Sequence, residues 1–517
     1  MAAKKNGTGS GLKKELSLLQ LTIIGIVGAV GTGVLFSAAG MAGDAGPASV
    51  ISWIIGGLMY ASVGYTYVEL SRTWPEAGGP TRYSLYTHGR FTNLINAFND
   101  LIWYLFIPPV EALAVVEGLN FLFPTLIAAS GAPTLLGAVL GVILLMFFIP
   151  FNYFGVRAFG KSTSIFGIIK LVFYLLVGFG IIAIFFNAKN FFGYSGGFAP
   201  FGAAGLFLAI PLAMFAYGGI RVVPDYAEEV KNKNILPKAI GYTVLGQTLI
   251  YILFSMALIG GITWGVNGLP AAGNWVGVGQ IVGNPFIILS NALHNSVLLV
   301  LVLIVGIIGP FVTGYVYIGG GSRILFAMGR SKIMNNIVTD ITRHSIPYWS
   351  IIIFAIVGAI VAFIAAPLPS IYGLITDAVV GGYLGFAVNP VALIVSRRQN
   401  SVEHRYKFAN IIAPIAFISA ALIAFWSGWP SVPYAVLILT IALIIFAIAF
   451  KVKEHFINSL WYIFFIAFIL LMTYIGDVGA LSILNFYVAT VVVVLVAGII
   501  FFPWGVYSGL KKPFIMK

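Results

Sequence analysis

The chain has 517 residues, of which 60% are hydrophobic and only 8% are Asp, Glu, Lys or Arg. Soluble domains carry roughly 25% charged residues. The composition therefore excludes a soluble enzyme, a disordered protein and a disulfide-stapled domain, and it argues against a β-barrel, whose lumen-facing positions must be polar. There is no cysteine, and none of the five histidines has metal-ligand spacing, so we expect neither a metal site nor a cofactor.

Fourteen apolar runs are long enough, at about 20 residues each, to cross a bilayer as helices. We therefore expect an all-α polytopic membrane protein. The predicted spans are 18–40, 47–72, 95–125, 133–152, 163–187, 200–222, 236–264, 297–328, 349–366, 370–395, 409–428, 432–450, 456–475 and 480–506.

Lysine and arginine residues fall almost entirely in alternate connections between these runs. The two exceptions are Lys189, on the other side, and Lys170, inside a run. Because cytoplasmic loops are enriched in cations, this pattern predicts that both termini are cytoplasmic. The net charge of +13 is then a topology signal that also attracts anionic lipid heads, and it does not indicate nucleic-acid binding.

Two of the runs contain helix-breaking residues near their centres. Run 1 has four glycines within Gly25–Gly33, and run 6 has Gly218 and Gly219 between Pro211 and Pro224. Glycines also permit close packing of membrane helices. However, interrupted helices at corresponding positions of two five-span repeats are typical of transporter sites. The N–H groups freed at a break suit a carboxylate, and the freed carbonyls suit an ammonium, so an α-amino acid would match both.

Several motifs resemble those of amino acid–polyamine–organocation (APC) permeases. They occur in chain order at Gly31–Phe36, Tyr67–Leu70, Pro75–Pro80, Asn152–Val156, Phe215–Gly219, Ala227–Asn232 and Ser322–Met328. The resemblance implies a LeuT-like 5+5 inverted repeat with discontinuous helices 1 and 6, plus four peripheral C-terminal helices. The expected units are a cytoplasmic tail at 1–17, repeats at 18–187 and 200–395, additional helices at 409–506 and a second cytoplasmic tail at 507–517.

The candidate substrate site lies at the two breaks. We expect backbone groups of Gly31, Thr32 and Gly33 to hold the substrate carboxylate. We expect carbonyls near Val27, Gly28, Phe215 and Ala216 to hold the ammonium. Tyr217, Gly219 and Ile220 complete the predicted site on the side of span 6. Ile220 stands where the resembling family often has an aromatic gate residue, and Arg221 stands where an acidic residue is common.

Charged residues inside the predicted spans are costly and usually functional. Glu111 is assigned to the substrate site, with a protonated, hydrogen-bonded carboxyl as the alternative. The roles of Glu117 and Asp377 stay open. In proton-coupled members of the resembling family, a span 5 lysine takes the place of a sodium ion, which implies proton coupling by Lys170. The alternative is a lysine whose ammonium reaches the interface.

Four charged residues at cytoplasmic ends of the spans form a predicted inner gate of ion pairs, with solvated interface charges as the alternative. They are Glu69, Glu228, Glu229 and Arg323.

The sequence favours a secondary carrier of amino acids or related amines in the cell membrane, driven by protons and working by alternating access. An amino acid or polyamine exchanger and a non-transporting sensor on the same fold are alternatives. A membrane-embedded enzyme is disfavoured because no histidine lies at bilayer depth. A major-facilitator carrier is disfavoured because its loop motif after span 2 is absent, and no nucleotide-binding motif is present. The sequence does not indicate an oligomeric state.

Overall fold

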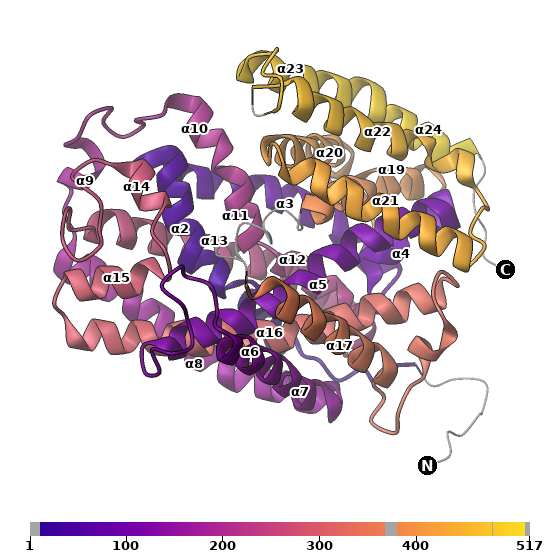
Figure 1. Ribbon diagram of the computed structural model, residues 1–517. Coiled ribbons are helices and arrows are strands. Elements are labelled where there is room, and N and C mark those ends of the chain that lie inside the picture. Colours follow the sequence, from indigo (N-terminus) through magenta and orange to yellow (C-terminus); the bar gives the residue numbers. More distant parts are fainter. Residues whose placement is uncertain (1–10, 368–379, 478, 512–517) are drawn as a thin grey trace.

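The computed structural model describes residues 11–367, 380–477 and 479–511. Within these ranges the regular structure is helical, with isolated β-bridges and no strand (Figure 1). Asp377 lies outside the described residues. The apolar composition explains the helices, because a membrane-spanning backbone must satisfy its own hydrogen bonds.

Thirteen helical stretches in the described part are long and apolar enough to cross a membrane. One of them, Thr32–Thr73, has 42 residues. At 1.5 Å per residue it would be about 60 Å long, twice the hydrocarbon thickness, so it must hold two crossings. It consists of α2 (Thr32–Ala45), the turn η1 (Gly46–Ala48) and α3 (Ser49–Thr73). Together with α1 (Leu18–Ala29), α2 forms the first span and α3 the second, which agrees with the predicted fourteen.

The later spans follow the predicted order. Span 3 is α5 (Arg90–Asn120), span 4 is α6 (Leu135–Phe147) with α7 (Ile149–Tyr153), and span 5 is α8 (Val156–Phe185). Span 6 is α10 (Gly202–Leu208), α11 (Ile210–Ala216) and α12 (Gly219–Asp225), span 7 is α13 (Leu236–Gly261), span 8 is α16 (Ser296–Arg330), span 9 is α17 (Tyr348–Ala365), and span 10 ends in α19 (Val388–Arg398). Span 11 is α20 (Ala409–Trp426), span 12 is α21 (Ser431–Ala449), span 13 is α22 (Phe456–Ile475), and span 14 is α23 (Phe486–Val496), η5 (Ala497–Phe501) and α24 (Phe502–Lys511).

Short helices lie between the spans. A helix between spans 2 and 3, α4 (Gly79–His88), packs on α5 and α19. The connection between spans 7 and 8 holds α14 (Trp275–Gly279) and α15 (Pro285–Ala292), of which α14 packs on α2. This connection therefore covers one end of the first span, as a structured cap.

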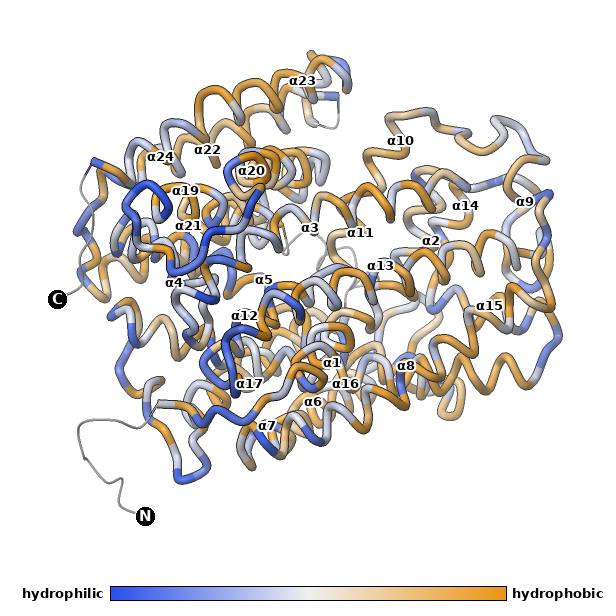
Figure 2. The backbone as a smooth tube through the Cα atoms, turned by 180° about the vertical axis from the view of Figure 1, so that it is seen from behind, coloured by the Kyte–Doolittle hydropathy of each residue, from blue (hydrophilic) through white to orange (hydrophobic). Residues whose placement is uncertain are grey.

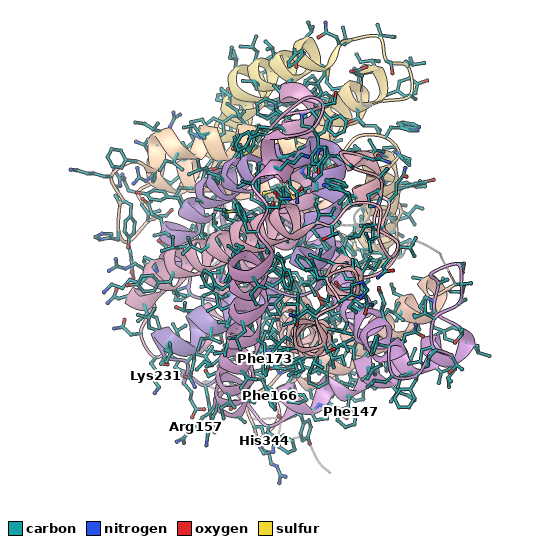
Figure 3. The ribbon with its side chains drawn as sticks, turned by 90° about the vertical axis from the view of Figure 1, so that its left-hand side faces the viewer. Phe147, Arg157, Phe166, Phe173, Lys231 and His344 are labelled. Atoms are coloured by element: carbon teal, nitrogen blue, oxygen red, sulfur yellow. The ribbon has the colours of Figure 1, made fainter. Side chains whose placement is uncertain are left out.

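Hydropathy separates the two ends of the molecule from its middle. Apolar helices run through the centre, and many hydrophilic segments gather at the end that holds both described ends of the chain (Figure 2). Arg157, Lys231 and His344 lie together at one end, whereas Phe166 and Phe173 follow α8 away from it (Figure 3). The location of both ends of the chain at one end of the molecule fits an even number of crossings.

The centre of the fold is formed by α1, α5, α12 and α16. The helices α5 and α16 pack along each other, and α1 packs on α8, α12, α13 and α16. The helix α21 is mostly exposed and covers α5 from outside. This arrangement places the two interrupted spans in the interior, where polar backbone can be tolerated.

Candidate substrate site and cytoplasmic gate

The first span is broken at Val30 and Gly31. Helix α1 ends at Ala29 and α2 begins at Thr32, and both intervening residues have non-helical backbone angles. A Cβ atom on Gly31 would lie 2.5 Å from the Thr313 hydroxyl oxygen and 2.6 Å from a carboxylate oxygen of Glu111. Glycine is therefore required at the break because two polar side chains approach the backbone there.

The sixth span is broken at Tyr217 and Gly218, between α11 and α12. A Cβ atom on Gly33 would lie 2.9 Å from the Cα atom of Ala216. The two breaks are therefore in contact, and the prediction of discontinuous helices 1 and 6 is confirmed.

A small cavity lies at these breaks. Its lining residues come from both broken spans and from α5 and α16, and they are Gly28, Ala29, Gly33, Ile107, Glu111, Phe215, Thr313 and Tyr317. Sequence reasoning named four of them and missed Ala29, Ile107, Thr313 and Tyr317. Ile107 lies on span 3, and Thr313 and Tyr317 lie on span 8. At these three positions the sequence has neither a helix break nor a charged residue that would have indicated a site.

Glu111 occupies the break in span 1. Its carboxylate accepts hydrogen bonds from the Thr32 backbone N–H, at 3.2 Å, and from the Thr32 hydroxyl, at 2.9 Å. Glu111 is 3% exposed, and within the described part of the chain it forms no ion pair within 4 Å. The N–H group that the sequence assigned to a substrate carboxylate is thus bound by a carboxylate of the protein itself.

Lys170 is buried beside the same break. Its ammonium donates to the Val27 carbonyl, the Gly309 carbonyl and the Thr313 hydroxyl, each at 2.8 Å. An ammonium has three N–H donors, so all of its hydrogen bonds are satisfied. Lys170 does not reach the interface; it joins span 5 to spans 1 and 8. The Thr313 hydroxyl that accepts from Lys170 and the Glu111 carboxylate both lie beside Gly31, at 2.5 and 2.6 Å from a Cβ atom built there.

Other predicted site residues pack elsewhere in this conformation. The Ala216 carbonyl accepts from the Tyr251 hydroxyl at 2.5 Å. The Tyr217 hydroxyl donates to the Trp53 carbonyl at 2.9 Å. A Cβ atom on Gly219 would lie 2.0 Å from the Gly25 carbonyl.

Ile220 also faces away from the cavity. A Cβ atom on Gly64 would lie 1.9 Å from the Ile220 Cδ1 atom, and the Ile220 N–H donates to the Tyr60 hydroxyl. The side chain therefore packs on span 2, and the prediction that it forms a pocket wall stays a prediction.

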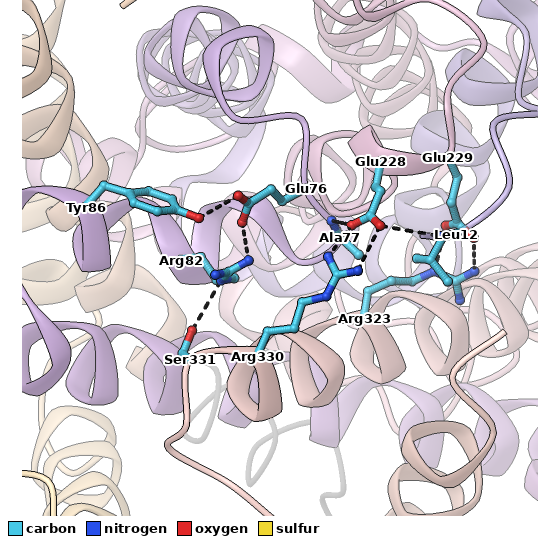
Figure 4. Close-up of polar contacts among 10 residues, drawn as sticks. All are labelled: Leu12, Glu76, Ala77, Arg82, Tyr86, Glu228, Glu229, Arg323, Arg330 and Ser331. Carbon is cyan, nitrogen blue, oxygen red and sulfur yellow. Dashed lines mark hydrogen bonds and ion pairs between the residues drawn. The ribbon is translucent and has the colours of Figure 1, made fainter. Parts of the chain in front are cut away.

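Buried ion pairs connect the ends of the spans that the sequence predicts to be cytoplasmic (Figure 4). Arg323 on α16 donates to both carboxylate oxygens of Glu229, at 2.8 and 2.9 Å, and both side chains are almost completely buried. Arg330, two turns further along α16, donates to both oxygens of Glu228, at 2.6 and 3.0 Å. Bidentate pairs of this kind hold one geometry, so they fix the end of span 6 to span 8.

The N-terminal segment and span 10 complete this closure. The Leu12 N–H donates to Glu228 at 3.3 Å, and the N–H groups of Glu15 and Leu16 donate to the Glu229 carbonyl, both at 2.9 Å. Glu69 on α3 accepts from Arg397 on α19 at 2.5 and 2.8 Å. Thus all four predicted gate residues are in ion pairs. Arg323 and Glu229 pair with each other, whereas Glu69 and Glu228 pair with arginines outside the predicted set.

Sequence reasoning missed Arg330 and Arg397. Both are basic residues in the last turn of a span, which is also the usual position of a solvated topology signal. Their partners are 102 and 328 residues away along the chain, so spacing could not find them.

Glu117 lies near the C-terminal end of α5, and a Cβ atom on Gly283 would lie 3.0 Å from its carboxylate. It is therefore in contact with the connection between spans 7 and 8 and is separated from the cavity.

The fold and the two broken spans define a class of polytopic carrier with a central site. A family model described as amino acid permease matches residues 16–452. The chain therefore belongs to the amino acid permease family, as the APC resemblance implied.

Three relatives cover most of the chain. It is 29% identical to the aspartate-proton symporter of Bacillus subtilis strain 168, over 97% of each chain. It is 27% identical to the glutamate/serine transporter AimA of the same strain, over 98% of this chain and 95% of the relative. It is 25% identical to the branched-chain amino acid permease BcaP of that strain, over 84% and 92%.

Proposed function

We propose that this protein is a proton-coupled secondary carrier of amino acids that works by alternating access around the two broken spans. The single observation that carries the proposal is the binding of the Glu111 carboxylate to the span 1 break, beside the buried Lys170 ammonium. A site with one acid and one base, both desolvated, can bind and release a proton. The names of two relatives, an aspartate-proton symporter and a glutamate/serine transporter, support this assignment.

The mechanism starts from competition between two carboxylates. The Thr32 N–H lies at the positive end of α2, which favours an anion. For the substrate carboxylate to bind there, Glu111 must leave, and it leaves most readily after it takes up a proton. Proton binding to Glu111 and substrate binding then favour each other. The substrate ammonium donates hydrogen bonds to backbone carbonyls at the breaks, such as those of Gly28 and Phe215.

Lys170 links this step to the conformation of the carrier. While charged, it holds the Val27 carbonyl to span 8 through Gly309 and Thr313. When it loses its proton, at least one of these acceptors loses its donor, and the contact between α1 and α16 weakens. We infer that this weakening precedes opening of the cytoplasmic ion pairs of Glu69, Glu228, Glu229 and Arg323.

The proposal extends to location. The carrier lies in the cell membrane with both termini in the cytoplasm, as the distribution of cations predicts. Spans 1–5 and 6–10 form the two repeats, at 18–187 and 200–395.

The experiment is transport by the purified protein in proteoliposomes with an imposed pH gradient. We expect accumulation of an amino acid when the outside is acidic, without sodium. Lys170→Ala should keep substrate binding, measured as a ligand-dependent thermal shift, but lose gradient-driven accumulation. Lys161→Ala is the matched control, because Lys161 lies exposed on the same helix. Binding without any transport by the parent would indicate a sensor. Strict sodium dependence, or full accumulation by Lys170→Ala, would contradict the coupling.

A further inference from the structure

Five carboxylates are buried in the described part of the chain, and two of them have no ionic partner. Glu69, Asp100 and Glu229 are paired with Arg397, Arg221 and Arg323. Among the described residues Glu111 and Asp225 have no ion-pair partner within 4 Å, and each accepts a hydrogen bond from a hydroxyl group instead. An arginine holds its carboxylate ionised, whereas a buried carboxyl without a cation can exist in the protonated form. Glu111 belongs to the site described above, and Asp225 does not.

Asp225 is the last residue of α12 and lies between the substrate site and the cytoplasmic ion pairs. It is seven residues beyond Gly218, about 10 Å along a helix, and three residues before Glu228. Its side chain accepts from the Tyr104 hydroxyl on α5, and its backbone carbonyl accepts from the Gly78 N–H at 3.0 Å. The titratable and charged groups around it are Tyr83 on α4, Asp100 and Tyr104 on α5, Arg221 on α12, Tyr226 next in the chain, and Tyr317 and Arg323 on α16.

Two tyrosines join this carboxyl to the substrate site. Tyr317 lines the cavity together with Glu111. Its ring lies 4.9 Å, centroid to centroid, from the ring of Tyr104, and Tyr104 donates to Asp225. Both rings come from α5 and α16, which pack along each other through the centre of the molecule. The Tyr317 and Tyr104 rings therefore lie between the cavity that Glu111 lines and the Asp225 carboxyl.

We propose that Asp225 is a second proton-binding site, which receives the transported proton from Glu111 and releases it to the cytoplasm. The inference rests on the proton-coupled transport proposed above. The Glu111 carboxyl loses its proton to a water at the Tyr317 hydroxyl. Tyr104 passes a proton to the Asp225 carboxylate and takes one from that water. The net change is one O–H bond broken at Glu111 and one formed at Asp225, which then gives its proton to cytoplasmic water when the ion pairs open.

Charge explains why this position suits such a step. Asp100 and Asp225 share the neighbourhood of Arg221, whose guanidinium contacts Asp100 at 2.7 Å and the Gly382 carbonyl at 2.9 Å. Because the Arg221 guanidinium is already neutralised by Asp100, it does not hold the Asp225 carboxyl in the ionised form. Asp225 can therefore alternate between its two protonation states. A proton arriving at Asp225 therefore removes a buried negative charge instead of creating a buried positive one.

The test compares Asp225→Asn with the parent in proteoliposomes by two assays. Substrate exchange at equal pH needs no net proton movement, whereas pH-driven accumulation, followed with a pH dye in the lumen, does. We expect exchange within about twofold of the parent, and accumulation with lumenal acidification slowed by at least about tenfold, because a positioned proton carrier typically contributes more than that. Tyr104→Phe should slow the same assay. Tyr83→Phe should not, because it removes a buried hydroxyl near the same carboxyl that has no hydrogen-bond partner among the described residues.

The outcomes separate this inference from the proposed function. A parent that accumulates substrate without any pH dependence contradicts proton coupling, and both proposals fail. A proton-driven parent with an equally fast Asp225→Asn variant overturns only the role of Asp225. Equal loss of exchange and accumulation in both Asp225→Asn and Tyr104→Phe would also overturn it, because the carboxyl would then only support the fold.

Discussion

At the scale of single residues, Gly31 shows how closely side chains approach the broken backbone. Any side chain there would meet the Thr313 hydroxyl and the Glu111 carboxylate. We expect Gly31→Leu to abolish amino acid binding, measured by thermal shift, in a protein that still elutes as a folded species from size exclusion. Gly180→Leu is the matched control, because a Cβ atom at Gly180 meets no atom of the described residues within 4 Å. Normal binding by Gly31→Leu would place the site elsewhere.

Glu111 makes a second prediction at this scale. Because a proton must free Thr32 from Glu111, substrate affinity of the parent should rise as the pH falls. In Glu111→Gln the competing charge is gone, and the affinity should become nearly independent of pH. Binding titrations at several pH values measure the difference, and parallel pH profiles for the two proteins would argue against competition between carboxylates.

Ile220 distinguishes a pocket wall from helix packing. A pocket wall predicts that Ile220→Phe narrows the substrate range and excludes the largest amino acids first. The contact with Gly64 predicts overpacking instead, with a loss of about 1–3 kcal/mol of stability and an unchanged rank order of substrates. The packing of Ile220 on span 2 favours the second result, which melting temperatures and a competition panel would measure together.

At the scale of elements, the proposed cytoplasmic gate consists of buried ion pairs. Arg323→Gln leaves Glu229 buried without its cation, and breaking such a pair typically costs about 3–5 kcal/mol. We expect a lower melting temperature and faster labelling of an introduced Ala29→Cys from the cytoplasmic side. Arg90→Gln is the control, because its partner Glu454 is 55% exposed and exposed pairs contribute about 0–1 kcal/mol. Equal effects of the two variants would contradict the gate.

Glu228 adds a pH dependence to the same element. Burial acts to raise the pKa of Glu228, but the hydrogen bonds and charge of Arg330, and the N–H groups of Ala77 and Leu12, outweigh it and hold the pKa below its usual value. A lowered pKa in the folded state gives stability that is present above the unfolded pKa, about 4.3, and is lost as the pH falls through the folded pKa. The melting temperature of the parent should therefore fall more steeply below about pH 4 than that of Glu228→Gln.

The elements were more predictable than their contacts. Glycine density identified both breaks, because glycine disfavours a continuous helix, and apolar length identified the spans. Thr313, Tyr317 and Arg397 could not be found in this way. They reach the site or the gate from distant spans, and only the packing of α16 and α19 decides where they point.

At the scale of the whole molecule, the natural absence of cysteine allows a direct test of topology. Lys14 and Lys189 are both exposed, and the cation distribution assigns them to opposite sides of the membrane. We expect Lys14→Cys to react with a membrane-impermeant maleimide only in inverted vesicles, and Lys189→Cys only in intact cells. The parent gives no background signal. Labelling of both positions from the same side would contradict the predicted orientation.

The C-terminal spans contact the carrier more closely than the label of peripheral helices implies. The helix α24 packs on α19 and α4, and the ring of His88 on α4 contacts the Gly505 carbonyl at 2.9 Å. Removal of span 14 would therefore leave the buried imidazole of His88 without its contact to the Gly505 carbonyl. This change would lie close to the proposed gate, because α4 directly follows span 2.

Through its contact with Thr32, the Glu111 carboxylate occupies the position proposed for the substrate carboxylate. In the proposed site the span 1 break holds the Glu111 carboxylate when no substrate is bound, so we expect the affinity for an amino acid to measure replacement of the Glu111 carboxyl by the substrate carboxylate. Substrate analogues that lack a carboxylate cannot replace Glu111, however well their side chains fit. Such amines would add to the occupied site and not empty it, and they would bind without driving the cycle, which is the behaviour of an inhibitor.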